Sequence, residues 1–253
     1  MSLIKSEKEI ELLKEGGKYL AFVLEKIKEK ISPGIFTKDL DIVAEKEIRK
    51  LGAVPSFLNY TPWGSEKPYP ASLCVSVNDE VVHGIPGGRI LKEGDIVGLD
   101  IGLIHEKLFV DMAETCPVGK ISDEDQKLIE KTKKALHLGI ASALPGSKIG
   151  AIGSAIENFA KPFGYGIVRD LGGHGVGHAV HEEPYIPNFG DKNSGEELLP
   201  GMVLAIEPML TCGTHKVKLL SDGYTVVTED GSRSAHFEHS IVITRGAPLI
   251  LTQ

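Results

Sequence analysis

The feature that most restricts the fold of this chain is a repeat of two helices. A capping-box pair, Ser6 and Glu9, opens a stretch whose apolar residues recur at helical spacing until Pro33. A second amphipathic stretch ends at Gly52, and residues 122–165 repeat this plan. The spacing is 112 residues for three matched pairs, Pro33 with Pro145, Glu45 with Glu157 and Gly52 with Gly164. The repeat predicts two related halves, about 1–120 and 121–253, within a single domain.

The strand segments repeat as well, and each copy carries two acidic residues. Residues 94–100 match 201–207, which places Glu207 where the first copy has Asp100. The other matched pair stands eight residues before a glycine in each half, Asp111 before Gly119 and Glu238 before Gly246. Because equivalent positions supply all four carboxylates, the repeat predicts a pseudo-twofold arrangement with a site between the halves.

Residues 94–115 are predicted to form two β-strands around a polar turn at 105–107. Pairing about a two-residue loop at 105–106 puts Asp100 directly opposite Asp111, with β-carbons ~5 Å apart. Small residues leave room beside the pair, Gly98 opposite Ala113 and Gly102 opposite Phe109. A bound cation would turn the repulsion between the acids into attraction, whereas an ordinary solvent-facing pair needs none. The hairpin alone leaves both interpretations open.

A glycine- and histidine-rich stretch at residues 172–184 allows three interpretations. Its glycines have the wrong spacing for a dinucleotide-binding loop. The helical His-Glu-x-x-His zinc motif is absent, because Glu182 is not followed by a second histidine, and the glycines disfavour a helix that would join His174 with His178. We therefore expect a close-approach loop that presents His174 and His181 to a site, although a lone histidine is more often structural.

Composition restricts the class of protein. With 253 residues, 42% hydrophobic and 25% charged, the chain is typical of a soluble globular protein. The formal net charge of −7, without a basic run, argues against a nucleic-acid surface. Cys74, Cys116 and Cys212 are widely spaced, which predicts a reducing compartment and no disulfide. A polar N-terminus and the lack of an apolar run of ~20 residues predict a cytoplasmic protein without membrane contact.

Taken together, the motifs resemble the type I methionine aminopeptidases over nearly the whole chain. The residues that resemble the five metal ligands of that family are Asp100 with Asp111, His174 in Gly-His-Gly-Val-Gly-His, Glu207 in Ala-Ile-Glu-Pro-Met and Glu238 in Phe-Glu-His-Ser-Ile. His83 and His181 resemble its two substrate-binding histidines. The 31 residues from Glu207 to Glu238 leave no room for the helical insert of type II enzymes, and no Cys/His-rich extension precedes the first helix. The resemblance implies an α+β pita-bread (creatinase/aminopeptidase) fold, a central antiparallel sheet flanked by helices, as one catalytic domain over 1–253.

The resemblance also implies chemistry at two divalent cations, Co, Mn, Fe or Zn, among which the sequence does not choose. In the family's pattern Asp111 and Glu238 bridge the ions, Asp100 completes one site, and His174 with Glu207 completes the other. The implied reaction releases N-terminal methionine from nascent proteins and peptides whose second residue is small. A hydroxide shared by the ions attacks the scissile carbonyl, Glu207 moves the proton, His181 stabilises the carbonyl oxygen and His83 contacts the peptide nitrogen.

Methionine selectivity requires an apolar pocket for a thioether. The candidates that match the family's pocket are Phe57, Tyr60, Tyr69, Cys74 and Tyr224, and each is equally compatible with a place in the core. The sequence departs from the family in two places. Tyr224 stands where many members have Trp, and residues 61–68 are longer than in compact bacterial members, as a lid or as a tolerated surface insertion.

Expected partners are nascent polypeptide N-termini and short peptides, with the ribosome as a candidate and no contact with nucleic acid or membrane. A monomer is expected. Two other functions stay open on the sequence. An X-Pro aminopeptidase or prolidase has a similar ligand set but usually carries a large extra N-terminal domain. A binding protein could keep the fold without the chemistry, although five intact ligands argue against it.

Overall fold

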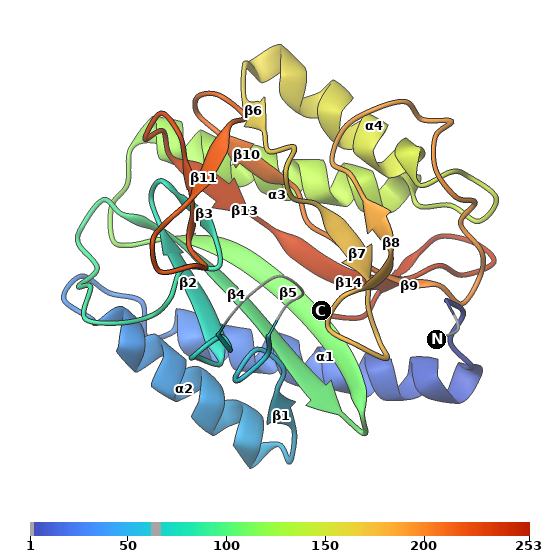
Figure 1. The fold of residues 1–253 in the computed structure, drawn as a ribbon, viewed down its shortest axis with the longest axis horizontal. Helices are drawn as coiled ribbons and strands as arrows, with labels where there is room; N and C mark the ends of the chain where they lie inside the picture. The colour runs from blue at the N-terminus through green and yellow to red at the C-terminus, as the bar shows by residue number, and fades with distance from the viewer. Residues whose placement is uncertain (1–2, 62–66) are drawn as a thin grey trace.

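The computed structural model describes residues 3–61 and 67–253 as helices packed on a large antiparallel sheet (Figure 1). The helices are α1 (Glu7–Lys28), α2 (Thr37–Lys50), α3 (Asp123–Ser142), α4 (Gly150–Ala160) and the 3₁₀ helix η1 (Lys161–Phe163). The strands are β1 (Val54–Pro55), β2 (Leu73–Val77), β3 (Glu80–Val82), β4 (Ile96–His105), β5 (Leu108–Pro117), β6 (Gly166–Ile167), β7 (Gly173–Gly175), β8 (Glu182–Ile186), β9 (Val203–Ile206), β10 (Met209–Thr211), β11 (Val217–Leu219), β12 (Val226–Thr228), β13 (Ser234–His236), β14 (Glu238–Val242) and β15 (Leu249–Ile250). Most of the predicted lid or insertion at 61–68 lies outside the described residues.

The main sheet joins strands from both ends of the chain. Its order is β1-β4-β5-β14-β9-β7-β8, with β2 also paired to β4 and β15 to β14. All of these pairs are antiparallel. The β5–β14 pair joins strands from before and after residue 120 at the centre of the sheet. Two smaller sheets, β13-β10-β6 and β11-β12-β3, accompany it. The expected α+β architecture around a central antiparallel sheet is confirmed.

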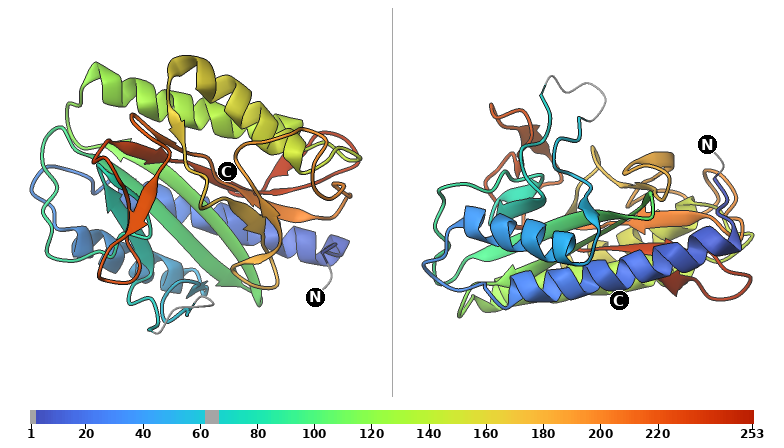
Figure 2. Two further views of the ribbon diagram at one scale, coloured as in Figure 1. Left: turned by 45° about the horizontal axis from the view of Figure 1, so that its top comes forward. Right: turned by 90° about the horizontal axis from the view of Figure 1, so that it is seen from below.

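The helices form where the sequence predicts them. Ser6 and Glu9 form the reciprocal capping box at the start of α1, and Ser122 caps α3 by accepting a hydrogen bond from the Asp125 amide. α1 packs on β4 and β5 and α2 on β2, while α3 contacts β9, β10, β13 and β14. The right-hand view of Figure 2 shows α1 running along one face of the sheet. None of the helices in the described part of the chain combines the length and the apolar composition that a membrane span requires.

The register of the β4–β5 hairpin differs from the predicted one. His105 pairs with Leu108, so the two-residue loop is Glu106–Lys107 rather than 105–106. Both loop residues have positive φ, 47° and 68°, as a type I′ hairpin turn requires. The sequence did not reveal this turn because neither residue is the glycine or asparagine that usually marks it.

As a result, the two acids of the hairpin do not face each other directly. Asp100 stands opposite Ala113 and Asp111 opposite Gly102, and the predicted partners of the neighbouring glycines were therefore also wrong, since Gly98 stands opposite Thr115. The correction shifts each partner by two residues, which preserves the alternation of faces. The two carboxylates still lie on the same face, as diagonal neighbours.

Candidate metal centre and substrate cavity

The residues predicted to be metal ligands come from five neighbouring strands of the main sheet. Asp100 lies on β4, Asp111 on β5, Glu238 on β14 and His174 on β7, while Glu207 directly follows β9. In the sheet order β4-β5-β14-β9-β7 these positions form a continuous path. Small residues lie between the predicted ligands. Ala113 pairs with Asp100 on one side and with Glu238 on the other, and Ala205 pairs with His174. The alanines leave space above the sheet in which longer side chains can meet.

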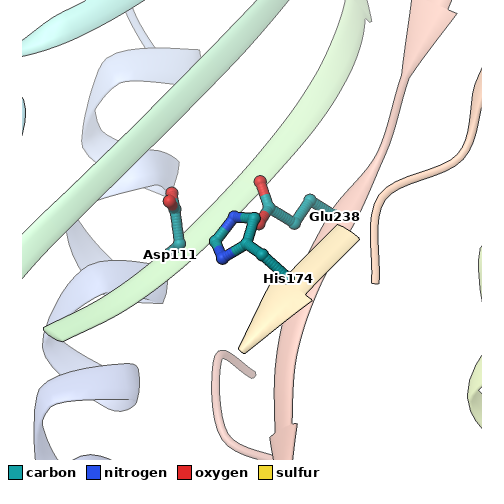
Figure 3. A group of neighbouring side chains, drawn as sticks. All are labelled: Asp111, His174 and Glu238. Atoms are coloured by element: carbon teal, nitrogen blue, oxygen red, sulfur yellow. The ribbon is translucent and has the colours of Figure 1, made fainter. Parts of the chain in front are cut away.

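Three of these side chains point toward one another (Figure 3). Asp111, His174 and Glu238 each place one ligand atom so that the three atoms lie within 4.8 Å of one another. Glu207 joins the group through His174, since its Oε1 lies 3.5 Å from the His174 Nε2. All four residues, together with Asp100, line one cavity of about 100 Å³. The structure therefore brings all five predicted ligands to one place.

The His174 segment is not the loop expected from its glycines. His174 lies on β7, a short strand between β8 and β9. A β-carbon at Gly173 would lie 2.3 Å from the Ala205 carbonyl oxygen, and one at Gly175 would lie 2.2 Å from that of Glu183. The glycines thus serve the predicted close approach, but between strand backbones. His181 follows in the turn before β8.

The electrostatics of the carboxylates are those of a cation site. Asp100 Oδ1, Asp111 Oδ1 and Glu238 Oε1 are buried without a hydrogen-bond partner. Burial raises the pKa of Asp100 to about 7 and that of Glu207 to about 8. The pKa values of Asp111 and Glu238 lie well above the usual range because of burial, and after it because of the charge of neighbouring carboxylates. Like charges gathered out of water favour protonation, and a bound cation would relieve the same repulsion.

The donor set fits divalent metal ions. Four carboxylates and one imidazole suit Mn²⁺, Fe²⁺, Co²⁺ or Zn²⁺. Burial, reinforced by His181, lowers the pKa of His174 to about 3, so its ring is neutral at physiological pH, as a ligand must be. The unpartnered carboxylate oxygens are the atoms that such an ion would satisfy.

The two predicted substrate-binding histidines line the same cavity. His83 has a left-handed backbone with φ 59°, and burial lowers its pKa to about 4. His181 is held by a hydrogen bond of 3.0 Å between its Nδ1 and the Tyr60 hydroxyl. The His181 ring packs edge-on against His174, with ring centroids 4.5 Å apart. Both imidazoles therefore lie beside the carboxylate cluster.

The apolar end of the cavity is formed by the residues predicted for the methionine pocket: Phe57, Tyr60, Tyr69, Cys74 and Tyr224. Cys74 on β2 stands opposite Asp100, which joins this end to the carboxylates. Tyr69 donates a hydrogen bond to the Gly84 carbonyl and packs edge-on against Tyr224. A β-carbon at Gly102 would lie 3.0 Å from the Phe57 ring, so this glycine permits the approach of Phe57.

Three further residues beside the site were not predicted. His236 places its Nε2 3.5 Å from Glu207 Oε2. Lys5 and Glu182 form a buried salt bridge next to His181. A sequence signal exists for His236 alone, because it stands two residues before Glu238, the spacing that puts side chains on one face of an extended chain. Lys5 is 177 residues from Glu182, too far for any local pattern.

Comparison with known protein sequences identifies metallopeptidases as the relatives of this chain. Residues 11–245 match the model of metallopeptidase family M24. The chain is 47% identical over 253 residues to methionine aminopeptidase 1 of Bacillus subtilis, with 100% of both chains covered. It is also 47% identical to the methionine aminopeptidase of Aquifex aeolicus, covering 98% of this chain and 97% of that one.

Comparison with solved structures identifies the same class of enzyme. The methionine aminopeptidase of Rickettsia prowazekii superimposes with a TM-score of 0.95 at 37% identity, and 99% of each chain is covered. The Thermotoga maritima enzyme gives 0.94 at 40% identity, covering 99% of this chain and 98% of that one. The prolidase of Pyrococcus horikoshii shares the fold, with a TM-score of 0.77 at 23% identity, but this chain covers only 63% of it. The expected pita-bread fold is thereby confirmed.

Proposed function

We propose that the buried carboxylate cluster of this chain holds two divalent cations. The premise is that the chain belongs to metallopeptidase family M24 and is a metallo-aminopeptidase that removes N-terminal methionine. In this proposal Asp100, Asp111, His174, Glu207 and Glu238 would hold the ions, with Asp111 and Glu238 shared between the two sites, Asp100 belonging to one site and His174 with Glu207 to the other. The observation that carries it is the convergence of Asp111, His174 and Glu238 within 4.8 Å among unpartnered buried carboxylates. When bound, such ions polarise the scissile carbonyl and make water a stronger nucleophile near neutral pH.

The residues of the chain supply proton transfer and orientation. Glu207, whose pKa burial raises to about 8 in the metal-free protein, can accept a proton from the attacking water and deliver it to the leaving amine. The Tyr60 hydroxyl lies 3.0 Å from His181 Nδ1. In the tautomer in which that hydroxyl donates to Nδ1, the Nε2 hydrogen of His181 is free for the substrate carbonyl oxygen. His83 contacts the nitrogen of the scissile peptide bond. Each role uses a group that lines the same cavity.

The apolar end of the cavity is proposed to hold the methionine side chain. Phe57, Tyr60, Tyr69, Cys74 and Tyr224 surround it with aromatic and sulfur atoms, which suit a flexible thioether. With methionine there, its free amine reaches the carboxylate end, because Cys74 stands opposite Asp100. This geometry favours cleavage after the first residue. The substrates that we propose are nascent proteins and peptides whose second residue is small.

We further propose that one catalytic domain of two related halves, about 1–120 and 121–253, acts as a monomer on nascent chains in the cytoplasm, with the ribosome as a candidate partner. The free thiols of Cys74, Cys116 and Cys212 fit a reducing compartment. Size-exclusion chromatography with light scattering tests the oligomeric state, and co-sedimentation with ribosomes tests the contact.

The central experiment measures release of methionine from Met-Ala-Ser. EDTA should abolish it, added Mn²⁺ or Co²⁺ should restore it, and elemental analysis should find two ions per chain. Ala-Pro-Ala is the control substrate, because an X-Pro peptidase would cleave it. Activity that persists in metal-free protein, or a preference for Ala-Pro-Ala, would contradict the proposal. A protein that retains no ion and cleaves neither peptide would instead indicate a binding protein.

A further inference from the structure

His236 touches the candidate site without belonging to the predicted ligand set. Its side chain is only 4% exposed, and its Nε2 lies 3.5 Å from Oε2 of Glu207. The other Glu207 oxygen, Oε1, lies 3.5 Å from the His174 Nε2. The Glu207 carboxylate therefore stands between two imidazoles. Among the described residues, His174 lines the cavity and His236 does not.

The backbone of His236 is bonded to one neighbouring strand and in register with another. The Thr115 hydroxyl accepts a hydrogen bond from the His236 amide and donates one to the His236 carbonyl, both at 2.9 Å. In addition, His236 on β13 is in register with Met209 on β10, two residues after Glu207. The backbone of His236 is therefore held close to Glu207 by two neighbouring strands, β5 and β10.

The ring nitrogen that faces Glu207 has no other partner. His236 Nε2 is buried and makes no hydrogen bond in the described chain. A buried polar group left in this state is destabilising, so its presence needs a reason. The Glu207 carboxylate is within reach, since catalytic hydrogen bonds are often long in the absence of ligands and shorten when the site is filled.

We infer that His236 is a positioning residue that donates a hydrogen bond from Nε2 to the Glu207 carboxylate. This bond fixes the orientation in which Glu207 serves the proposed cation site and the proposed proton transfer. The inference rests on the proposed role of Glu207 and adds a residue to it. With Oε2 held by His236, Oε1 is the oxygen that faces His174. Partners of this kind, which orient ligands from outside, change metal affinity or activity by ~10–100-fold when they are removed.

Two amide substitutions test the inference. In His236→Gln the side-chain amide nitrogen occupies about the position of Nε2, whereas in His236→Asn it reaches only the position of Nδ1. Titration calorimetry of Co²⁺ into metal-free protein should show cation affinity ~10–100-fold weaker for His236→Asn and within ~3-fold of wild type for His236→Gln. With Met-Ala-Ser, kcat should fall by a similar factor for His236→Asn, with KM nearly unchanged, and His236→Gln should recover it.

His239 supplies the matched control. It follows Glu238 directly, but its Nδ1 contacts the Thr252 hydroxyl at 2.9 Å, and strand alternation turns it away from the cavity. His239→Gln and His239→Asn should both match wild type in Co²⁺ affinity and turnover. If His236→Asn does not fold, as judged by circular dichroism, His236→Leu takes its place, because leucine removes the donor without burying an amide.

The outcomes separate the two proposals. A wild-type protein that binds no Co²⁺ contradicts the proposed function. A wild-type protein that binds Co²⁺ as expected, with His236→Asn equal to it, overturns only the role of His236. Equal defects in His236→Gln and His236→Asn also overturn that role, because they would mean that the imidazole itself, and not a donor at Nε2, is required.

Discussion

Lys5 and Glu182 form a salt bridge of 2.7 Å in which the side chains are only 1% and 8% exposed. Glu182 also accepts hydrogen bonds from the backbone amides of His178 and Ala179. The ring of His178 in turn contacts Glu9 of α1 at 2.7 Å. The start of the chain thus holds both ends of the turn that leads into His181, and connects the N-terminal segment to the candidate site.

Replacing Lys5 by Met should destabilise the protein by about 3–5 kcal/mol, because the Glu182 carboxylate would remain buried without its partner. Urea denaturation followed by circular dichroism measures the change. The control is Lys14→Met, which breaks the exposed pair of Lys14 and Glu11 and should cost about 0–1 kcal/mol.

The double variant Lys5→Met with Glu182→Gln should recover most of that loss, since the neutral amide leaves no unpaired charge and its carbonyl oxygen can still accept from the His178 and Ala179 amides. If Lys5→Met alone were as stable as wild type, the pair would not anchor the turn. Turnover of Met-Ala-Ser by the double variant then reports whether the pair also sets the position of His181.

Asp111→Asn should lose metal and activity together. Asp111 lies among the three convergent ligand atoms, and the amide removes one negative charge and one oxygen from a ligand proposed to bridge both ions. Elemental analysis after dialysis measures the retained metal, and methionine release measures activity. Glu114→Gln on the same strand is the control, because Glu114 pairs with Lys28 and is not among the described residues that line the cavity. Full metal content in Asp111→Asn would exclude the bridging role.

His181→Ala should keep its metal and lose turnover by ~10²–10³-fold, the effect typical of removing one hydrogen-bond donor to a developing oxyanion. Steady-state kinetics with Met-Ala-Ser and elemental analysis of the same sample test this. Tyr60→Phe should show a smaller loss, because it removes only the hydroxyl that holds His181 Nδ1. Metal loss in His181→Ala equal to that in Asp111→Asn would show that His181 is a ligand.

The metal-free protein should become less stable as pH rises from 7 to 8. In this window the folded state still holds protons on Asp100 and Glu207, whose pKa values burial raises to about 7 and about 8. The unfolded chain has released these protons, since its carboxyl pKa values lie near 4. Stability falls with pH wherever the folded state binds more protons, here by about 1–3 kcal/mol per pH unit.

Burial also lowers the pKa values of six histidines, and this has the opposite effect, mainly below about pH 6.5, where unfolded histidines take up protons; the six are His83, His137, His174, His181, His236 and His239. Urea titrations at pH 7.0, 7.5 and 8.0 measure the slope. Protein saturated with Mn²⁺ is the control, and its slope should be shallower, because bound cations replace the protons in the folded state. Equal slopes with and without Mn²⁺ would mean that the carboxylates do not bind the metal.

The sequence predicted those features that depend on local pattern. The Ser6–Glu9 capping box fixes the start of α1 through hydrogen bonds three residues apart, and such contacts are visible in any window of sequence. The alternation of side chains along a strand likewise placed Asp100 and Asp111 on one face, even though the predicted register was wrong by two residues. The matched acids of the two halves, together with the family resemblance, pointed to the residues that line the cavity.

Tertiary structure alone decided how those residues meet. The hairpin register depended on the left-handed backbone of Glu106 and Lys107. Glutamate and lysine rarely adopt that conformation, so the sequence does not indicate it. The approach of His236 to Glu207 requires β13 to pair with β10, and the burial of Lys5 against Glu182 requires the chain to return after 177 residues. Local sequence sets backbone preferences and side-chain alternation through short-range sterics and hydrogen bonds. Contacts between distant segments form only when the whole core packs, so their partners are fixed by the fold.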